Sequence, residues 1–161
     1  MREIPLTQGK FALIDDEDFN ILSVWKWHLN NGYASSTASA AEQRSAGSGK
    51  VIRISMHRVL AGLSYDDVRV VDHIDGNKLN NQRANLRVCS NSQNLQNRGA
   101  QANNSSGFKG VTWNKRDRRW HARISVGPKN KHLGTFRSAA EAGEAYRAAA
   151  LLFHGEFAYQ R

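Results

Sequence analysis

Asp72 and His73 directly follow residues 68–71, a stretch of mostly apolar, β-branched side chains that predicts a strand. A neutral imidazole, with an ordinary pKa of about 6.5, can take a proton from water at neutral pH, which makes His73 a candidate general base. Carboxylate and amide oxygens, such as those of Asp72 and Asn94, are ligands that hard divalent cations prefer. Together these residue types could perform metal-assisted hydrolysis. Taken alone, an Asp-His pair at a strand end can also be a simple turn with a satisfied histidine.

The segments that follow His73 predict how these residues could meet. Residues 75–77, Asp-Gly-Asn, predict a turn, and residues 86–89 predict a second strand. Serine hydroxyls just beyond it can cap the first amides of a helix. Two strands followed by a helix bring that helix back against the end of the first strand. The 22 positions between Asp72 and Asn94 are therefore no obstacle to a shared site.

Three segments resemble the phage-type HNH endonucleases: VDHIDGNKLNN at residues 71–81, NLR at 85–87 and SQN at 92–94. The resemblance implies a small ββα-metal nuclease core over residues 57–98 that hydrolyses phosphodiester bonds in DNA. It also implies the roles of four residues: His73 and Asn85 in catalysis, and Asp72 and Asn94 as metal ligands.

The family motif places two asparagines in this chain. Asn85 occupies the central position, which in the family steadies the loop and orients the base. The last position is often histidine and is Asn94 here, so the resemblance is to the variant with an asparagine ligand. Such oxygen ligation implies a divalent metal, with Mg²⁺ as the ordinary intracellular ion and Mn²⁺ as a substitute.

His57-Arg58, at the start of a predicted helix over residues 56–63, matches a pair found upstream in this nuclease group. Either side chain could contact a phosphate, although a histidine at a helix start more often makes a local hydrogen bond. A zinc site of His57, His73 and Cys89 would lack a fourth ligand and paired spacing. We therefore expect Cys89 to be a packing residue.

Composition limits the class of protein. A chain of 161 residues can form one ordinary domain or two small ones, since domains usually have roughly 50–200 residues. Its one cysteine excludes an internal disulfide framework and a Cys-rich zinc site. Residues 1–20 do not resemble a signal peptide, and no stretch approaches the roughly 20 apolar residues of a membrane span. We expect no membrane partner and a cytoplasmic location in a bacterial or phage-infected cell.

The residues before the nuclease motif predict an N-terminal α/β lobe, residues 1–56. Strands are expected at residues 10–15 and 25–29 around a helix at 16–24. A Ser, Ala and Gly-rich loop is expected at 35–49, before a strand at 51–55. After the nuclease core, residues 99–106 have no periodic apolar pattern and predict a linker.

The basic charge of the chain is concentrated in its C-terminal third. The net charge is +9, and residues 108–161 contain 11 basic and 4 acidic side chains. Such an excess favours polyanionic partners, nucleic acid above all, although a solvated basic surface can also have no function. Strands are expected at 108–113, 120–126 and 132–136, and a helix at 138–153. Ser138 and Glu141 form a predicted capping box at the start of that helix.

Residues 110–116, 119–124, 132–136 and 139–149 resemble the ethylene-response-factor DNA-binding domain. The resemblance implies that residues 107–161 form a three-stranded antiparallel sheet, packed on one helix, whose other face enters the major groove. Alternation along residues 120–126 agrees, because apolar side chains would face the helix and polar ones the DNA. The implied DNA contacts are Lys109, Thr112, Asn114, Arg116, Arg118, Arg123, Ser125, Lys131 and His132. Arg123 is the expected base reader, since arginine can contact guanine with two hydrogen bonds.

The sequence thus predicts an α+β protein, a monomer that nicks double-stranded DNA as a homing or mobile-element endonuclease. The alternative is a DNA-binding regulator whose nuclease half is inactive. The two hypotheses differ in whether Asp72, His73 and Asn94 support metal-dependent cleavage.

Overall fold

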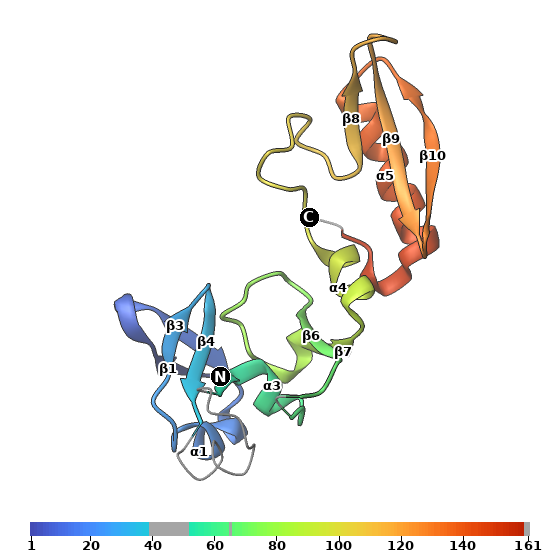
Figure 1. The fold of residues 1–161 in the computed structure, drawn as a ribbon. Coiled ribbons are helices and arrows are strands. Elements are labelled where there is room, and N and C mark those ends of the chain that lie inside the picture. Colours follow the sequence, from blue (N-terminus) through green and yellow to red (C-terminus); the bar gives the residue numbers. More distant parts are fainter. Residues whose placement is uncertain (39–51, 65, 160–161) are drawn as a thin grey trace. The chain divides into compact units, whose positions relative to one another are not determined.

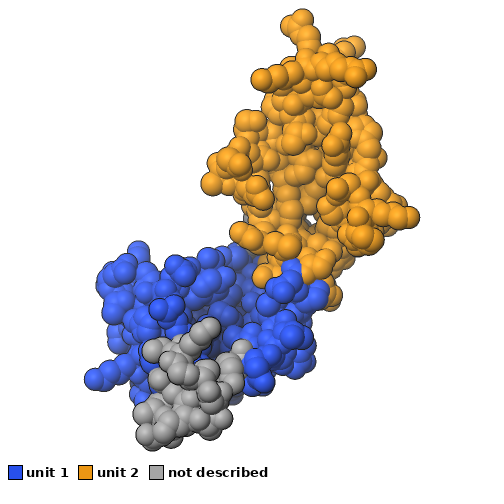
Figure 2. Space-filling view, viewed as in Figure 1, with its two compact units in different colours: residues 1–91 blue, residues 92–161 orange. Residues whose placement is uncertain are grey.

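A computed structural model describes residues 1–38, 52–64 and 66–159. Helices and strands are mixed along the chain, which confirms the α+β class (Figure 1). The chain divides into two compact units, Met1–Asn91 and Ser92–Arg161, shown in different colours in Figure 2. Most of the loop expected at residues 35–49, and the first residue of the strand expected at 51–55, lie outside the described residues. No helix in the described part of the chain is long and apolar enough to cross a membrane.

Two small antiparallel sheets form the first part of unit 1. β1 (Arg2–Pro5) pairs with β2 (Phe11–Ile14), with the short 3-10 helix η1 (Thr7–Gly9) between them. The second sheet has the order β3 (His28–Asn30), β4 (Tyr33–Thr37), β5 (Arg53–Ser55). Helical segments η2 (Asp16–Asp18), α1 (Phe19–Leu22) and α3 (Met56–Leu60) accompany these sheets.

Sequence patterns misplaced several elements of this lobe. The strand expected at residues 25–29 begins only at His28, and the helix expected at 16–24 is a 3-10 turn followed by the single-turn α1. β4 includes Ser35 and Ser36, which we expected to begin the loop. Both serines are buried, and β4 lies between β3 and β5. The backbone bonds of a central strand thus outweigh the weak strand preference of serine, which local composition cannot reveal.

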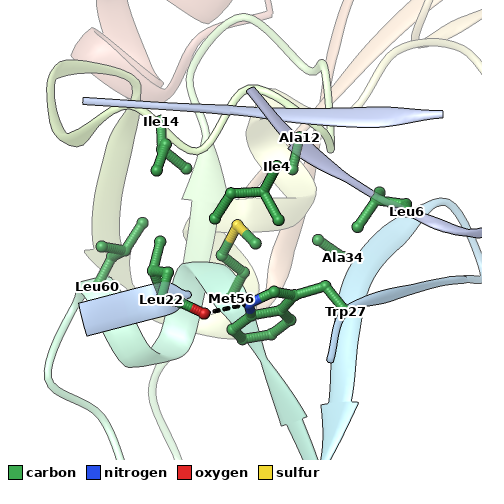
Figure 3. Packing of buried hydrophobic residues seen from close by; sticks show 9 residues of the cluster. All are labelled: Ile4, Leu6, Ala12, Ile14, Leu22, Trp27, Ala34, Met56 and Leu60. Carbon is green, nitrogen blue, oxygen red and sulfur yellow. Dashed lines mark hydrogen bonds between the residues drawn. The ribbon is translucent and has the colours of Figure 1, made fainter. Parts of the chain in front are cut away.

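The core of unit 1 joins both sheets to α1 and α3 (Figure 3). It consists of Ile4, Leu6, Ala12, Ile14, Leu22, Trp27, Ala34, Met56 and Leu60. Trp27 packs here with its indole N–H donating to Leu22 O at 2.8 Å, so its one polar atom is satisfied within the core. This core fixes the lobe against which the following segments pack.

The strand pair that carries the nuclease motif is β6 (Val70–His73) with β7 (Leu86–Cys89), in antiparallel register. The segment between them docks on β2: Leu13 N donates to Leu79 O and Asn81 N donates to Leu13 O, both at 2.8 Å. Arg83, in η3 (Arg83–Asn85), makes an ion pair of 2.6 Å with Asp18, whose exposed fraction is 1%. The lobe and the motif therefore belong to one folded unit.

Unit 2 contains most of α4 (Asn91–Asn97) and a three-stranded antiparallel sheet in the order β10 (Lys129–Phe136), β9 (Arg119–Val126), β8 (Val111–Asn114). The helix α5 (Ala139–His154) packs on one face of this sheet, followed by η4 (Gly155–Phe157). The sheet and helix expected for this region are thus present.

Close packing holds α5 on the sheet. Ile124 and Ala122 of β9 are buried against Tyr146, Ala142 and other residues of α5. Gly110 has φ +71°, and a Cβ there would lie 2.3 Å from the ring of Tyr146, so only glycine fits this position. Ser138 Oγ accepts from Glu141 N at 3.2 Å, which confirms the predicted N-cap.

Candidate active site

His73 lies at the end of β6 with an exposed fraction of 5%. Its Nε2 is 3.4 Å from Oδ1 of Asn81, a residue with no exposed surface. Asn81 Nδ2 donates to Leu79 O at 3.1 Å, which fixes the amide with its oxygen toward the histidine. Burial lowers the pKa of His73. The hydrogen bond with Asn81 and the negative charges of Asp75 and Asp72 act in the opposite direction, but burial is the larger effect. The imidazole is therefore neutral at pH 7, the state that a general base requires.

Asp72 is buried beside it and pairs with Arg87 across the two strands. Its Oδ2 accepts from Arg87 Nε at 2.9 Å and from Nη2 at 2.7 Å. The Arg87 guanidinium thus holds the Asp72 carboxylate in place through two charge-assisted hydrogen bonds.

The donor atoms of Asp72 and Asn94, the expected metal ligands, indicate whether these residues suit a divalent metal ion. Among residues 1–38, 52–64 and 66–159, no three or more His, Cys, Asp and Glu side chains gather into a metal site. Mg²⁺, however, is commonly held by one or two carboxylates together with water and substrate phosphates. The carboxylate of Asp72 is a donor of the kind that such a site uses. Asn94 lies on α4 in unit 2, so its meeting with Asp72 stays a prediction.

Asn85, at the end of η3, ties together the loop that follows His73. Its Oδ1 accepts from Asp75 N at 2.9 Å, and its Nδ2 donates to Asp75 Oδ1 at 2.9 Å and to Asn80 O at 2.8 Å. Its own backbone carbonyl accepts from Ile74 N at 2.9 Å. These bonds hold residues 74–80 against the start of β7.

Three rings from three elements meet at His73. Tyr33 of β4 lies with its ring centroid 5.1 Å from that of His57 and 5.9 Å from that of His73. The rings of His57, in α3, and His73 are 5.2 Å apart. Burial, followed by the charges of His73 and Arg58, lowers the pKa of His57 to about 3. His57 is therefore a neutral neighbour of the base, and its buried Nδ1 has no hydrogen-bond partner among the described residues.

The guanidinium of Arg58 donates to backbone carbonyls of the segment that precedes β6. Its Nη1 donates to Arg69 O at 2.9 Å, and its Nη2 donates to Asp67 O at 3.0 Å and to Ser64 O. This guanidinium holds the loop between α3 and β6 in the described residues. A phosphate contact by Arg58 or His57 stays a prediction.

In unit 2, β9 alternates as expected, with one exception. Ala122 and Ile124 are buried toward α5, and Arg123 and Ser125 are exposed on the opposite face. The exception is His121, which shares the polar face but is buried, 2.9 Å from Asp117. Cross-strand pairing places Thr112 opposite His121, Asn130 opposite Ser125, and His132 opposite Arg123, so these side chains share the outer face.

Other expected DNA contacts have local partners. Lys109 Nζ donates to Leu95 O at 2.9 Å and to Gln96 O at 2.7 Å, the last turn of α4, and burial lowers its pKa to about 8. Asn114 Oδ1 accepts from Arg116 N and Asp117 N and so closes the turn between β8 and β9.

The remaining basic candidates lie at the surface. Arg116 and Arg118 are exposed in the turn between β8 and β9. Lys131 lies with its ammonium 4.4 Å from the ring of Phe153 on α5, toward the helix side of the sheet. The DNA-contact roles of all these residues stay predictions.

Sequence reasoning did not assign roles to four residues that the fold brings to the site: Tyr33, Lys78, Asn81 and Arg87. Lys78, Asn81 and Arg87 lie within the segments that carry the family resemblance, and their positions in those segments were the available signal. Tyr33 precedes His73 by 40 positions, and no local pattern connects the two.

Comparison with known proteins bears on the segment that contains this site. An HNH endonuclease family model matches residues 64–96, which include Asp72, His73, Asn85 and Asn94. Protein 3.8 of Escherichia phage T7 is 33% identical over 88 residues, which cover 55% of this chain and 72% of that protein. The uncharacterized HNH endonuclease L560 of Acanthamoeba polyphaga mimivirus is 28% identical over 152 residues, 94% of this chain and 74% of its own length. No solved structure matches the chain significantly. Residues 64–96 of this chain thus match the HNH endonuclease family.

Proposed function

We propose that this chain is a metal-dependent endonuclease that hydrolyses phosphodiester bonds in duplex DNA. The observation that carries the proposal is His73, a buried neutral imidazole held at Nε2 by Asn81 next to the carboxylate of Asp72, within the segment that matches the family. This arrangement provides a base and an oxygen ligand for a hard cation side by side, which water activation at a phosphate requires.

Asn81 orients the imidazole of His73. Its Oδ1 lies 3.4 Å from Nε2, and Nδ2 of the same amide donates to Leu79 O. In this orientation His73 would take the proton from the attacking water. Asn85 keeps the loop after His73 in place while this proton moves.

Asp72 and Asn94 would hold the metal, Mg²⁺ or Mn²⁺. When bound, such an ion supplies positive charge to the scissile phosphate and to the departing oxygen. Arg87 would keep the Asp72 carboxylate oriented for that role.

We propose that residues 107–161 bind DNA in the manner of an ethylene-response-factor domain. The outer face of its sheet would lie in the major groove, with Arg123 reading a base and the arginines of the β8–β9 turn on phosphates. This module would position the cut, as in a homing or mobile-element endonuclease. With one His73 per chain, a monomer would nick one strand.

Cleavage of supercoiled plasmid by the full chain tests the function. With Mg²⁺ or Mn²⁺ the expected product is nicked circular plasmid, and excess chelator should stop the reaction. The His73→Ala variant serves as the control for contaminating nucleases. A chain that binds DNA but leaves the plasmid supercoiled with either metal would instead be the regulator with an inactive nuclease half.

A further inference from the structure

Lys78 lies in the loop after His73 and is fixed by the turn between β3 and β4. Its ammonium donates to Asn31 O at 3.2 Å. A Cβ on Gly32 would lie 3.3 Å from Lys78 Cδ, so the stem of the lysine passes closely over this glycine. Asn31 and Gly32 both have positive φ, 51° and 84°, as in a two-residue hairpin turn, which presents the Asn31 carbonyl in a defined place.

The ring of Tyr33 links this lysine to the candidate base. Lys78 Nζ is 4.4 Å from the Tyr33 ring centroid, a cation–π distance. The same ring contacts His57 and His73 at centroid distances of 5.1 and 5.9 Å. The Tyr33 ring thus contacts both the ammonium of Lys78 and the imidazole of His73.

Lys78 differs from the other cations around this site in its partners. Arg87 pairs with Asp72, and the guanidinium of Arg58 binds three backbone carbonyls. Lys78 is exposed, and in the described residues its ammonium has one hydrogen-bond acceptor and no carboxylate partner. An ammonium has three N–H donors, so two remain for an anion.

We propose that Lys78 binds a phosphate of the DNA backbone at the cleavage site, held in place by Tyr33 and the Asn31–Gly32 turn. This inference rests on the proposed function and names a binding residue for it. A compact ammonium is suited to phosphate as a point charge, and its attraction grows as negative charge develops on the phosphate oxygens during hydrolysis. Pre-placement by the turn also reduces the entropy lost when the flexible lysine stem is ordered on DNA.

Kinetics of the full-length variants test the proposal. Lys78→Gln should lower kcat/KM for plasmid nicking about tenfold, and should reduce the slope of log DNA affinity against log salt concentration by about one, the contribution of one phosphate contact. Lys78→Arg, which keeps the positive charge, should restore most of the rate. The matched control is Lys10→Gln, an exposed lysine of the same unit, which should change neither quantity.

Lysine acetylation of the wild-type chain, with and without a 30-base-pair duplex and read by mass spectrometry, gives a measure that does not need cleavage. Lys78 should be protected by DNA and Lys10 should not. If Lys78 reacts equally in both samples, or if Lys78→Gln nicks at the wild-type rate, the proposal is wrong. If the wild-type chain cuts no DNA, the proposed function fails, and protection of Lys78 still decides whether it binds the backbone.

Discussion

At the scale of single residues, hydrogen-bond partners distinguish the two histidines of the site. Both lie against Tyr33, and burial lowers the pKa of each. His73 has Asn81 as a partner at Nε2, whereas Nδ1 of His57 has none in the described part of the chain. His73 therefore has the orientation that a base needs, and His57 is better suited to packing beside it.

Replacing His73 by Ala should lower the nicking rate by about 10²–10⁴, the usual contribution of a general base. DNA affinity should stay within about twofold, since the variant loses no phosphate anchor. Single-turnover cleavage and duplex binding measure the two effects. Asp72→Ala should also fail, but through weaker metal binding, so that raising the metal concentration restores part of its rate. A His73→Ala variant with the wild-type rate would contradict the assigned role.

His57 should make unit 1 less stable in acid. Its folded pKa of about 3 lies below the ordinary value of 6.5, so the unfolded chain binds the proton more readily. The stability contributed by the neutral histidine is complete above pH 6.5 and decreases as the pH falls from 6.5 toward 3, by up to about 1.4 kcal/mol per pH unit. His57→Gln should flatten this part of the urea-unfolding profile. An unchanged slope in His57→Gln would contradict this role of His57.

At the scale of elements, the β6–β7 strand pair contains a buried ion pair directly beside His73. Asp72 and Arg87 are cross-strand neighbours with a closest N–O distance of 2.7 Å and exposed side-chain fractions of 6% and 13%. Arg69 and Asp67 make an ion pair of the same length, but the Arg69 side chain is 59% exposed. The two pairs therefore differ mainly in burial.

Arg87→Ala should lower the free energy of unfolding by about 3–5 kcal/mol, because it leaves the Asp72 carboxylate buried without its cation. Arg69→Ala should cost much less, as is usual for an exposed pair. Urea denaturation followed by tryptophan fluorescence compares them, with Trp25 and Trp27 as reporters in unit 1. Equal decreases in the free energy of unfolding of the two variants would show that burial of the Asp72–Arg87 pair does not add to its contribution to stability.

At the scale of the whole molecule, the uneven charge suggests a division of labour. The net charge is +9, and the 11 basic residues of the segment 108–161 outnumber its 4 acidic ones. Unit 2 also includes the end of α4, whose last carbonyls are bound by Lys109. A fragment for binding studies should therefore begin at Ser92, where the unit begins, so that this contact is kept.

The 92–161 fragment should retain most of the DNA affinity of the full chain. If about six phosphates are neutralised, log affinity should fall with log salt with a slope near −5. Arg123→Ala should relax preference at one base pair by about 1–3 kcal/mol, while Arg116→Ala, in the β8–β9 turn, should affect all sequences alike. Binding isotherms over a salt series, on cognate and scrambled duplexes, measure both. Selective binding of the cognate duplex by residues 1–91, and not by 92–161, would reverse this division.

Local sequence patterns by themselves determined the elements whose signals lie within a few residues. Residues 86–89 form β7 as predicted, Ser138 caps α5, and the alternation of Ala122 and Ile124 with Arg123 and Ser125 sets the two faces of β9. The family motif likewise indicated His73 and Asp72. Strand period, capping and motif spacing are local properties of the chain, so they can be identified without knowing what packs where.

Tertiary structure alone decided the surroundings of the base. The contact of Tyr33 with His73 and the placement of Lys78 over Gly32 depend on how the β3–β4 hairpin packs against a segment some 40 residues later. The burial of Asn81 depends on its segment docking on β2 through Leu13. Such contacts arise when a shared core fixes distant segments together, and the free energy of that packing is not encoded in any local window of sequence.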